Sequence, residues 1–284
     1  MKTFSDVRRT LPRAAWWTAC VCVSVVILYP IYVMLSQSLK SSAESTSNPP
    51  TLYPHAISVD NYRSLGNTGQ FGIWQHVANS LAVAAGSTVL TVALATLAGY
   101  GFARLRFRGS GILFFVILAT FMIPFQAIIT PLFSILHDLG LGNTLLGLTL
   151  VYTTFQLPFG IFLMRNSFAS LPTSIEEAAL IDGCGYLSAM ARVMLPVAIP
   201  GLISTALFTF FTSWNEFFAA LILVTDEAKF TLPVTLTVLA SNQLGTLNWG
   251  IMQAGVAVTA VPCIVLYLLL QRYYVAGLVA GAVK

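Results

Sequence analysis

Six apolar stretches, each long enough to cross a lipid bilayer as a helix, constrain this chain more than any other feature. A helix rises ~1.5 Å per residue, so about 20 apolar residues span the hydrocarbon core. Only 8% of the 284 residues are charged, against roughly 25% in an average soluble domain. The sequence therefore predicts an all-α membrane protein with six helices. The predicted spans are residues 14–36, 77–101, 111–136, 145–165, 201–225 and 251–272.

Basic residues predict the orientation, because short cytoplasmic loops carry an excess of Lys and Arg. With both termini in the cytoplasm, eleven of the 14 basic residues lie inside: Lys2, Arg8, Arg9, Arg13, Arg104, Arg106, Arg108, Arg165, Arg192, Arg272 and Lys284. The outer side carries only Lys40, Arg63 and Lys229. This orientation places 1–13, 166–200 and 273–284 in the cytoplasm and the loops 37–76 and 226–250 outside.

The first apolar stretch also has features of a secretory signal, since basic residues precede it. It is too long for one, and no small-residue cleavage site follows promptly, so we expect a retained first span. Prolines inside the spans predict kinks, which neighbouring helices and hydroxyl side chains can tolerate. These are Pro30, Pro124, Pro131, Pro158 and Pro262.

The loop at residues 172–196 has the pattern of two short helices around a glycine bend. Thr173 and Ser174 each precede a glutamate by three residues, the reciprocal capping arrangement of a helix start. Gly183 can adopt the left-handed conformation that ends the first helix, and Pro196 would stop the second. An amphipathic linker on the membrane surface would share this pattern. The acidic side chains of Glu176, Glu177 and Asp182 argue against it, because anionic lipid heads repel them.

The loop resembles a known family motif. Glu177-Ala178-Ala179, Gly183 and Leu195-Pro196 are similar to the EAA loop of binding-protein-dependent ABC importers, with Val193 where the motif often has Ile. Trp214-Asn215-Glu216-Phe217 and the C-terminal residues 271–284 resemble the second permease subunit of carbohydrate importers, the group of the maltose and glycerol-phosphate systems.

The resemblance implies a six-helix type I ABC importer permease with cytoplasmic coupling helices, in the bacterial inner membrane. Its partners would be a second permease, two cytoplasmic ATPase subunits, an extracytoplasmic binding protein for a sugar or sugar derivative, and membrane lipid. The loop 226–250 would probe the binding protein, and the tail 273–284 would contact the ATPases. The residues expected to couple to the ATPases are Glu176, Glu177, Ala178, Ala179, Asp182, Gly183, Leu195 and Pro196.

The sequence offers no catalytic chemistry of its own. A P-loop needs Gly-Lys-Ser/Thr, and none of the four lysines (Lys2, Lys40, Lys229, Lys284) follows a glycine. We therefore expect no cofactor in this chain, with ATP and Mg²⁺ bound by the partner ATPase. The three histidines have no metal-site spacing. Because the basic residues are not gathered in one run or on one face, we expect no nucleic acid partner.

Glu216 is the deepest acidic residue of the predicted spans, within 201–225. An ionisable group at such depth usually faces a water-filled cavity or a partner. One hypothesis is a substrate pathway, in which Glu216 and Asn215 contact sugar hydroxyls and Trp214, Phe217 and Phe218 offer stacking faces. The other is a structural hydrogen bond between subunits. For Arg104, Arg106 and Arg108 the expected role is anchoring the topology, with ATPase or lipid-head contact as the alternative.

Two other classes of function are compatible with a membrane bundle. An ion-coupled secondary transporter would need a relay of intramembrane polar groups, and Glu216 alone is a thin basis for one. A membrane scaffold or receptor would lack ATPase partners. Within the ABC class, a permease for a solute other than a sugar stays open, and the sequence does not identify the sugar.

Overall fold

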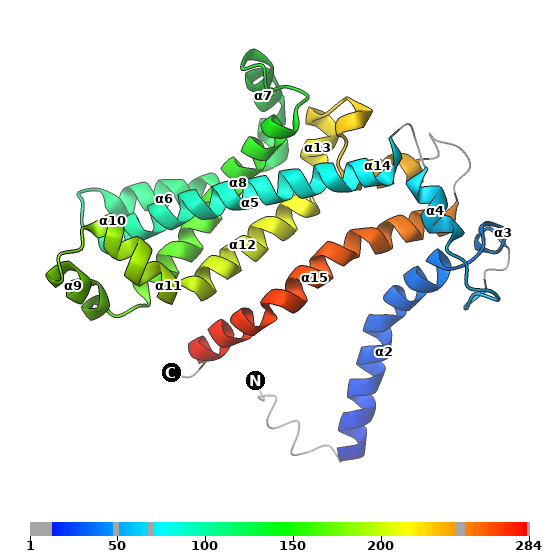
Figure 1. Ribbon diagram of the computed structural model, residues 1–284, viewed down its shortest axis with the longest axis horizontal. Helices are drawn as coiled ribbons and strands as arrows, with labels where there is room; N and C mark the ends of the chain where they lie inside the picture. The colour runs from blue at the N-terminus through cyan, green and yellow to red at the C-terminus, as the bar shows by residue number, and fades with distance from the viewer. Residues whose placement is uncertain (1–12, 48–50, 68–70, 242–247, 283–284) are drawn as a thin grey trace. The chain divides into compact units, whose positions relative to one another are not determined.

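The computed structural model describes residues 13–47, 51–67, 71–241 and 248–282, and every regular element in these residues is helical (Figure 1). This confirms the all-α prediction. The helices are α2 (Arg13–Ser38), α3 (Ser42–Ser45), α4 (Asp60–Gly66), α5 (Gly72–Arg104), α6 (Ser110–Thr120), α7 (Phe125–Asp138), α8 (Leu145–Ala169), α9 (Thr173–Ile181), α10 (Tyr186–Ala189), α11 (Leu195–Val197), α12 (Ile199–Trp214), α13 (Phe218–Leu223), α14 (Leu232–Ala240) and α15 (Trp249–Ala282).

Four helices among the described residues, α2, α5, α8 and α15, are long and apolar enough to cross a membrane. The number rises to six if each of two bent helix pairs counts as one span. The first pair, Ser110–Thr120 with Phe125–Asp138, falls on the predicted span 111–136, whereas the second joins Tyr186–Val197 of the predicted cytoplasmic loop to Ile199–Trp214. The chain divides into two compact units. Unit 1 comprises Met1–Ile73 and Val238–Ala260, and unit 2 comprises Trp74–Thr237 and Val261–Lys284.

Unit 1 is organised around Asn61 of α4, which is fully buried. Its side-chain amide donates hydrogen bonds to the carbonyls of Ser38 (3.1 Å) and Lys40 (2.7 Å), just after α2. A Cβ placed on Gly250, in the first turn of α15, would lie 2.5 Å from Asn61 Nδ2. The close approach of the Asn61 side chain to the backbone of α15 therefore requires glycine at position 250, and Asn61 joins α2, α4 and α15.

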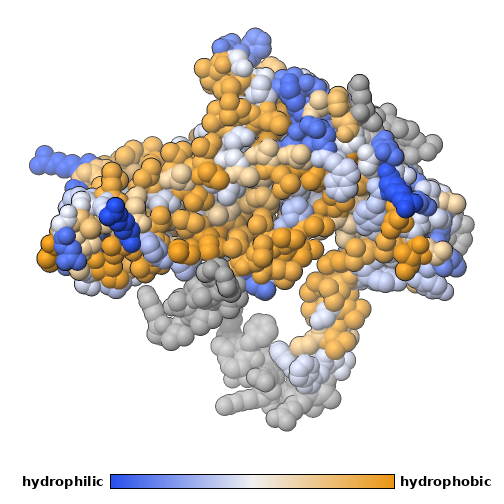
Figure 2. Space-filling view, viewed as in Figure 1, coloured by the Kyte–Doolittle hydropathy of each residue, from blue (hydrophilic) through white to orange (hydrophobic). Residues whose placement is uncertain are grey.

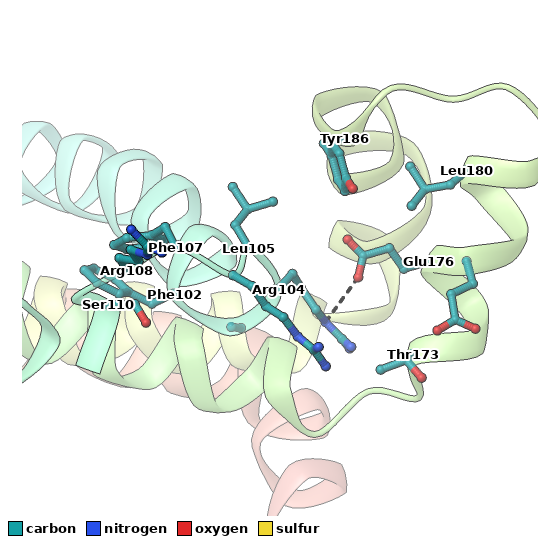
Figure 3. Close-up of a pocket in the computed structure, with 13 residues that line it drawn as sticks. Phe102, Arg104, Leu105, Phe107, Arg108, Ser110, Thr173, Glu176, Leu180 and Tyr186 are labelled. Carbon is teal, nitrogen blue, oxygen red and sulfur yellow. Dashed lines mark ion pairs between the residues drawn. The ribbon is translucent and has the colours of Figure 1, made fainter.

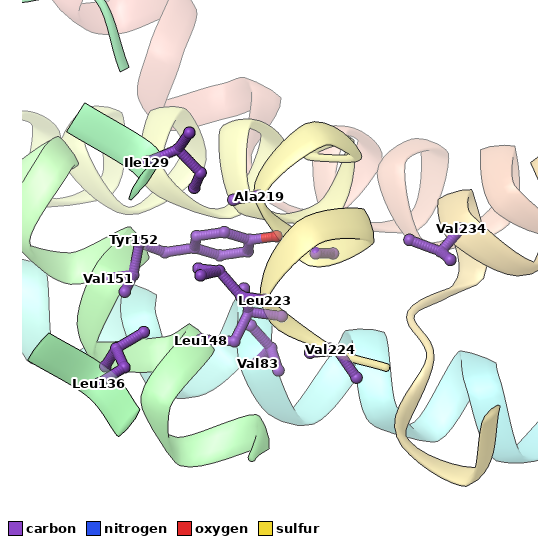
Figure 4. Packing of buried hydrophobic residues seen from close by; sticks show 11 residues of the cluster. Val83, Ile129, Leu136, Leu148, Val151, Tyr152, Ala219, Leu223, Val224 and Val234 are labelled. Carbon is purple, nitrogen blue, oxygen red and sulfur yellow. The ribbon is translucent and has the colours of Figure 1, made fainter. Parts of the chain in front are cut away.

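Unit 2 has its core between α5, α8 and the helices that follow. One buried cluster includes Val83 of α5, Val151 and Tyr152 of α8, and Leu223 of α13 (Figure 4). A second lies at the other end of α8 and includes Phe168. Outward faces stay apolar: Figure 2 shows hydrophobic side chains across the exposed surfaces of α5 and α6. Such surface suits lipid tails or another apolar helix.

The third predicted span, 111–136, is not one helix. It is broken between α6 and α7, whose axes differ by 93°. Pro124 is the N-cap of α7 with an extended backbone, and a residue that precedes proline is pushed out of the helical region. The sequence correctly placed a kink at Pro124, and the structure shows that the kink is a full break.

The fifth predicted span, 201–225, is also interrupted. The helix α12 ends at Trp214, and α13 begins only at Phe218. Before α12, residues 186–197 form a continuous helical run with a π turn at Met190–Met194, bent by 81° from α12. The run ends at Val197, one residue after Pro196, so the predicted stop is confirmed to within one residue. The π turn precedes the proline, and such turns accommodate a residue that lacks an N–H donor.

Candidate functional site

The loop between α8 and α12 folds into α9 and the helical run 186–197, separated by a sharp bend (Figure 1). Gly183 has φ +87°, which confirms its predicted left-handed conformation. The N–H groups of Cys184 and Gly183 donate to the carbonyls of Ala179 (3.0 Å) and Leu180 (3.1 Å). This is the Schellman pattern, which satisfies the last carbonyls of a helix. Glycine at position 183 thus sets the angle between the two loop helices.

The start of α9 differs from the prediction. Its N-cap is Pro172, and no side chain accepts a hydrogen bond there. The capping by Thr173 and Ser174 with the two glutamates is therefore wrong. The physical reason lies in Glu176, which is 7% exposed and whose carboxylate is engaged away from its own helix. It accepts a hydrogen bond from the Tyr100 hydroxyl.

Arg104, the last residue of α5, holds the loop in place (Figure 3). Its Nη2 atom donates to the carbonyls of Phe168 and Leu171, both at 2.7 Å. Its Nε lies 3.5 Å from Glu176 Oε2, and the arginine side chain is only 6% exposed. The carbonyls at a helix C-terminus lack helical partners and favour a cation. One arginine therefore joins the ends of α5 and α8 to α9.

The sequence prediction for Arg104, a topology anchor, missed this role. A signal was present: Tyr100 and Arg104 are four residues apart, so they share one face of α5. The partner, Glu176, lies 76 residues from Tyr100. Nothing local to either segment indicates that pairing.

The loop has a buried face and an exposed face. Met190, Met194 and Ala198 pack in the cluster that contains Tyr100 and Phe168, and Leu195 is partly buried against it. Of the predicted coupling residues, Glu176 and Ala179 are buried. The others lie at the surface: Glu177, Ala178, Asp182, Gly183 and Pro196.

Exposed apolar side chains join these residues, which the sequence analysis did not single out. Ile181 is 86% exposed and Leu187 is 71% exposed. Beside them is a cavity of about 670 Å³ between the end of α5 and α9, lined among others by Arg106, Arg108 and Glu177 (Figure 3). The outer face of the loop thus combines acidic and apolar groups on a rigid base, an arrangement suited to docking another protein.

Glu216 lies in the break between α12 and α13. Its carboxylate accepts hydrogen bonds from the N–H groups of Ala219 (2.9 Å) and Ala220 (3.2 Å), at the start of α13. The Tyr152 hydroxyl donates to its Oε2 at 2.6 Å, and Figure 4 shows this tyrosine among the buried residues beside α13. Within this chain the glutamate therefore has a structural role, which joins α8 to the break.

The other residues of the predicted substrate pathway do not form one cavity-facing set. Trp214 is 1% exposed, and its ring stacks on Phe210 at 5.9 Å between centroids. Asn215 is exposed and donates to the Phe211 carbonyl at 2.8 Å. Phe217 and Phe218 are half-buried against the cluster of Figure 4. In this structure the aromatic faces of this segment are used largely in packing.

A buried polar contact between three helices was also missed. The hydroxyls of Ser87 in α5 and Ser213 in α12 lie 2.7 Å apart, and the Gln156 amide of α8 donates to Ser213 at 2.8 Å. Polar side chains hold helices together where lipid replaces water. Gln156 therefore belongs to an interhelical network.

The segment that begins the predicted external loop 226–250 is held on α5. The Asn79 amide donates to the carbonyls of Ala228 (2.9 Å) and Phe230 (3.0 Å). Hydrogen bonds from Lys229 and the Ala228 N–H lower the pKa of Asp226 below its ordinary value. The loop then forms α14, and residues 242–247 lie outside the described residues. So do residues 1–12 of the predicted N-terminus and residues 283–284 of the predicted tail, while α15 continues to Ala282.

Comparison with known proteins identifies the family. The model of the binding-protein-dependent transport system inner membrane component matches residues 91–277, which include both loop helices. The inner membrane ABC transporter permease protein YcjP of Escherichia coli (strain K12) is 34% identical over 277 residues, with 98% of each chain covered. The diacetylchitobiose uptake system permease protein DasC of Streptomyces coelicolor is 33% identical, with 98% of this chain and 100% of the relative covered.

A solved structure agrees with this assignment. A bacterial ABC transporter involved in the import of the acidic polysaccharide alginate matches 96% of this chain and 99% of its own chain, with a TM-score of 0.79 and 25% identity. Members of this family are membrane subunits of ABC transporters, without a catalytic site of their own. The chain belongs to the family of binding-protein-dependent transport system inner membrane components.

Proposed function

We propose that this chain is a permease subunit of an ATP-driven importer of a sugar or sugar derivative, and that it forms half of the translocation pathway. The observation that carries the proposal is the loop after α8. Its buried face is fixed to α5 and α8 by Arg104 and Glu176, while Glu177 and Ile181 face outward. A rigid base with an exposed face is what a docking element needs in order to pass movement to the spans.

The partners in this proposal are a second, related permease, two cytoplasmic ATPase subunits that bind ATP and Mg²⁺, and an extracytoplasmic binding protein. The loop would seat on one ATPase, which requires the loop and both termini to lie in the cytoplasm. The distribution of basic residues supports that orientation. When the ATPases close, force on α9 would reach the ends of α5 and α8 through Arg104.

The assignment to sugars rests on the relatives, whose names include a diacetylchitobiose permease and an alginate importer. An ion-coupled mechanism finds less support. Its relay would need a free intramembrane carboxylate, and the Glu216 carboxylate already accepts from Tyr152 and from two backbone N–H groups. The remaining alternative is an ATP-driven permease for a solute other than a sugar.

The test is transport by the whole importer in proteoliposomes, with N,N′-diacetylchitobiose and trehalose as the first probes. We expect uptake that requires ATP and persists when a protonophore removes the proton gradient. In the Glu177→Ala and Ile181→Ala variants we expect ATP hydrolysis to continue while sugar uptake falls. Ile57→Ala is a matched control, because Ile57 is also an exposed isoleucine (78%) but lies far along the chain from the loop.

Two results would overturn the proposal. Uptake that ignores ATP and collapses with the proton gradient would favour the ion-coupled alternative. Uptake by the Glu177→Ala and Ile181→Ala variants that stays matched to ATP hydrolysis, as in the Ile57→Ala control, would remove the loop from the coupling role.

A further inference from the structure

Unit 1 contains a pocket of about 400 Å³ that the coupling loop and the core of unit 2 do not involve. Three segments of the unit form it: the end of α2, the end of α3 and the start of α15 (Figure 1). Its volume lies within the range of small-molecule sites, ~300–1,000 Å³. In the proposed orientation this end of unit 1 faces the outside of the cell.

The two long helices each contribute a pair of side chains spaced by four residues, so that both members lie on one helix face. The helix α2 provides Val33 and Gln37, and α15 provides Trp249 and Gln253. The Trp249 side chain is large, apolar and 50% exposed. The amides of Gln37 and Gln253 make no hydrogen bond to the part of the chain that the structure describes. Two amides and one indole face are therefore available to a ligand.

The wall of the pocket is held in place before any ligand arrives. Asn248 Oδ1 accepts hydrogen bonds from the N–H groups of Gly250 (2.9 Å) and Ile251 (3.2 Å), which caps α15. The same oxygen accepts from the Ser45 hydroxyl of α3 at 3.1 Å. Asn248 thus links the helix that carries Trp249 to the hydroxyl-bearing residues 45–47. Preorganised walls reduce the ordering cost of binding.

The chemistry of the lining selects a class of ligand. An indole offers a flat apolar face, and two amides offer donors and acceptors beside it. The three hydroxyls of residues 45–47 already donate within the chain, so they offer acceptors. A pyranose ring has matching surfaces, because its axial C–H bonds form an apolar face and its hydroxyls lie around the edge. Among the described residues, no Lys, Arg, Asp or Glu lines the pocket. A charged sugar that moved from water into this pocket would find no opposite charge, so its binding would carry a high desolvation cost.

The alternative explanation is that Trp249 is an interfacial anchor, since tryptophans gather at the boundary between lipid and water. That accounts for the indole alone. It does not account for the two glutamines, which come from different helices and face the same cavity as the indole.

We propose that the pocket formed by Gln37, Trp249, Gln253 and residues 45–47 binds one pyranose ring of a neutral carbohydrate. The inference deepens the proposed function and rests on it, because it assigns a neutral sugar to an importer of sugars. It also distinguishes this chain from a transporter of an acidic polysaccharide such as alginate.

Saturation-transfer NMR on the full-length chain in lipid nanodiscs tests the pocket directly. The probes are trehalose and N,N′-diacetylchitobiose, with glucose 6-phosphate as the charged comparison. We expect transfer to the ring C–H protons of at least one neutral probe, and none to the charged one. Trp249→Ala should remove most of that signal, Trp249→Phe should keep it, and Gln253→Ala should reduce it.

Trp74→Ala is the matched control, because Trp74 is similarly exposed (59%) but belongs to unit 2. Equal transfer in the Trp249→Ala and Trp74→Ala variants, or equal transfer to glucose 6-phosphate, overturns the pocket assignment. If the importer still takes up a neutral sugar when the pocket assignment is overturned, the proposed function is retained. Failure of the importer to take up any sugar, with uptake of another solute, overturns the proposed function itself.

Discussion

The Tyr152 hydroxyl donates a 2.6 Å hydrogen bond to the Glu216 carboxylate, which joins α8 to the break between α12 and α13. The same carboxylate caps α13 through the N–H groups of Ala219 and Ala220. A helix that starts at membrane depth needs acceptors for its first N–H groups, because lipid supplies none. The Glu216 carboxylate supplies these acceptors, and its own oxygens are hydrogen-bonded in return.

Glu216→Ala should therefore destabilise the protein as well as affect transport. The substitution leaves the Tyr152 hydroxyl and the α13 N–H groups without their acceptor, and loss of a helix cap costs about 0.5–2 kcal/mol. Leaving a buried donor unpaired adds about 1–3 kcal/mol. Thermal unfolding in nanodiscs measures the change. Tyr152→Phe should reproduce only part of it, since the cap remains. Wild-type stability of Glu216→Ala together with lost transport would instead support a substrate contact.

The link between Arg104 and the loop predicts a specific effect of a conservative substitution. Lysine keeps the charge, but it cannot match the fork with which arginine reaches two carbonyls and Glu176 at once. One hydrogen bond to a charged group contributes about 1.5–3 kcal/mol. Arg104→Lys should therefore accelerate amide hydrogen exchange in α9 by roughly tenfold or more, since 1.4 kcal/mol is a factor of ten.

Arg106→Lys supplies the control for that measurement, because Arg106 is exposed and close along the chain. Its exchange rates in α9 should equal those of the wild type. If Arg104→Lys also left these rates unchanged, the arginine would not anchor the loop, and its role would revert to topology alone.

The features that sequence predicted well are those set by local chain properties. Apolar length predicted the four unbroken membrane helices, α2, α5, α8 and α15, and the conformational freedom of Gly183 predicted the bend after α9. Long-range pairings were not predictable. Glu176 follows a capping pattern with Thr173, but its carboxylate goes to Tyr100 and Arg104, partners that only the packed α5 supplies.

The prediction of one unbroken helix through Glu216 failed for a related reason. A lone acidic residue in an apolar run fits either a transport pathway or an internal cap. Choosing between them requires Tyr152, which lies 64 residues earlier, and the N–H groups of a short helix that hydropathy merges with α12.

Gly183 and Gly185 form a matched pair for testing the bend. A Cβ at either position would meet no other atom within 4 Å. Only Gly183 has positive φ, at +87°, a conformation that costs an L-residue roughly 1–2 kcal/mol. Gly183→Ala should lower stability of the α9 end by about that amount, while Gly185→Ala should not. Hydrogen exchange at Cys184, whose N–H closes the bend, reports the difference. Equal effects would show that the bend tolerates a side chain.

Gly99 and Gly101 provide a second pair, on α5. A Cβ on Gly99 would lie 2.6 Å from Met164 Cβ and 2.8 Å from Arg165 N, so α5 must move away from α8 to admit it. A Cβ on Gly101 would meet nothing within 4 Å. Overpacking of this kind costs about 1–3 kcal/mol.

Gly99→Ala should therefore lower the unfolding temperature, and Gly101→Ala should leave it unchanged or raise it slightly, since alanine favours helix over glycine. Because α5 also carries Tyr100 and Arg104, the displacement in Gly99→Ala should loosen α9 and speed its hydrogen exchange. Exchange in α9 that stays at the wild-type rate, despite a lowered unfolding temperature, would show that the loop is held independently of the contact between α5 and α8.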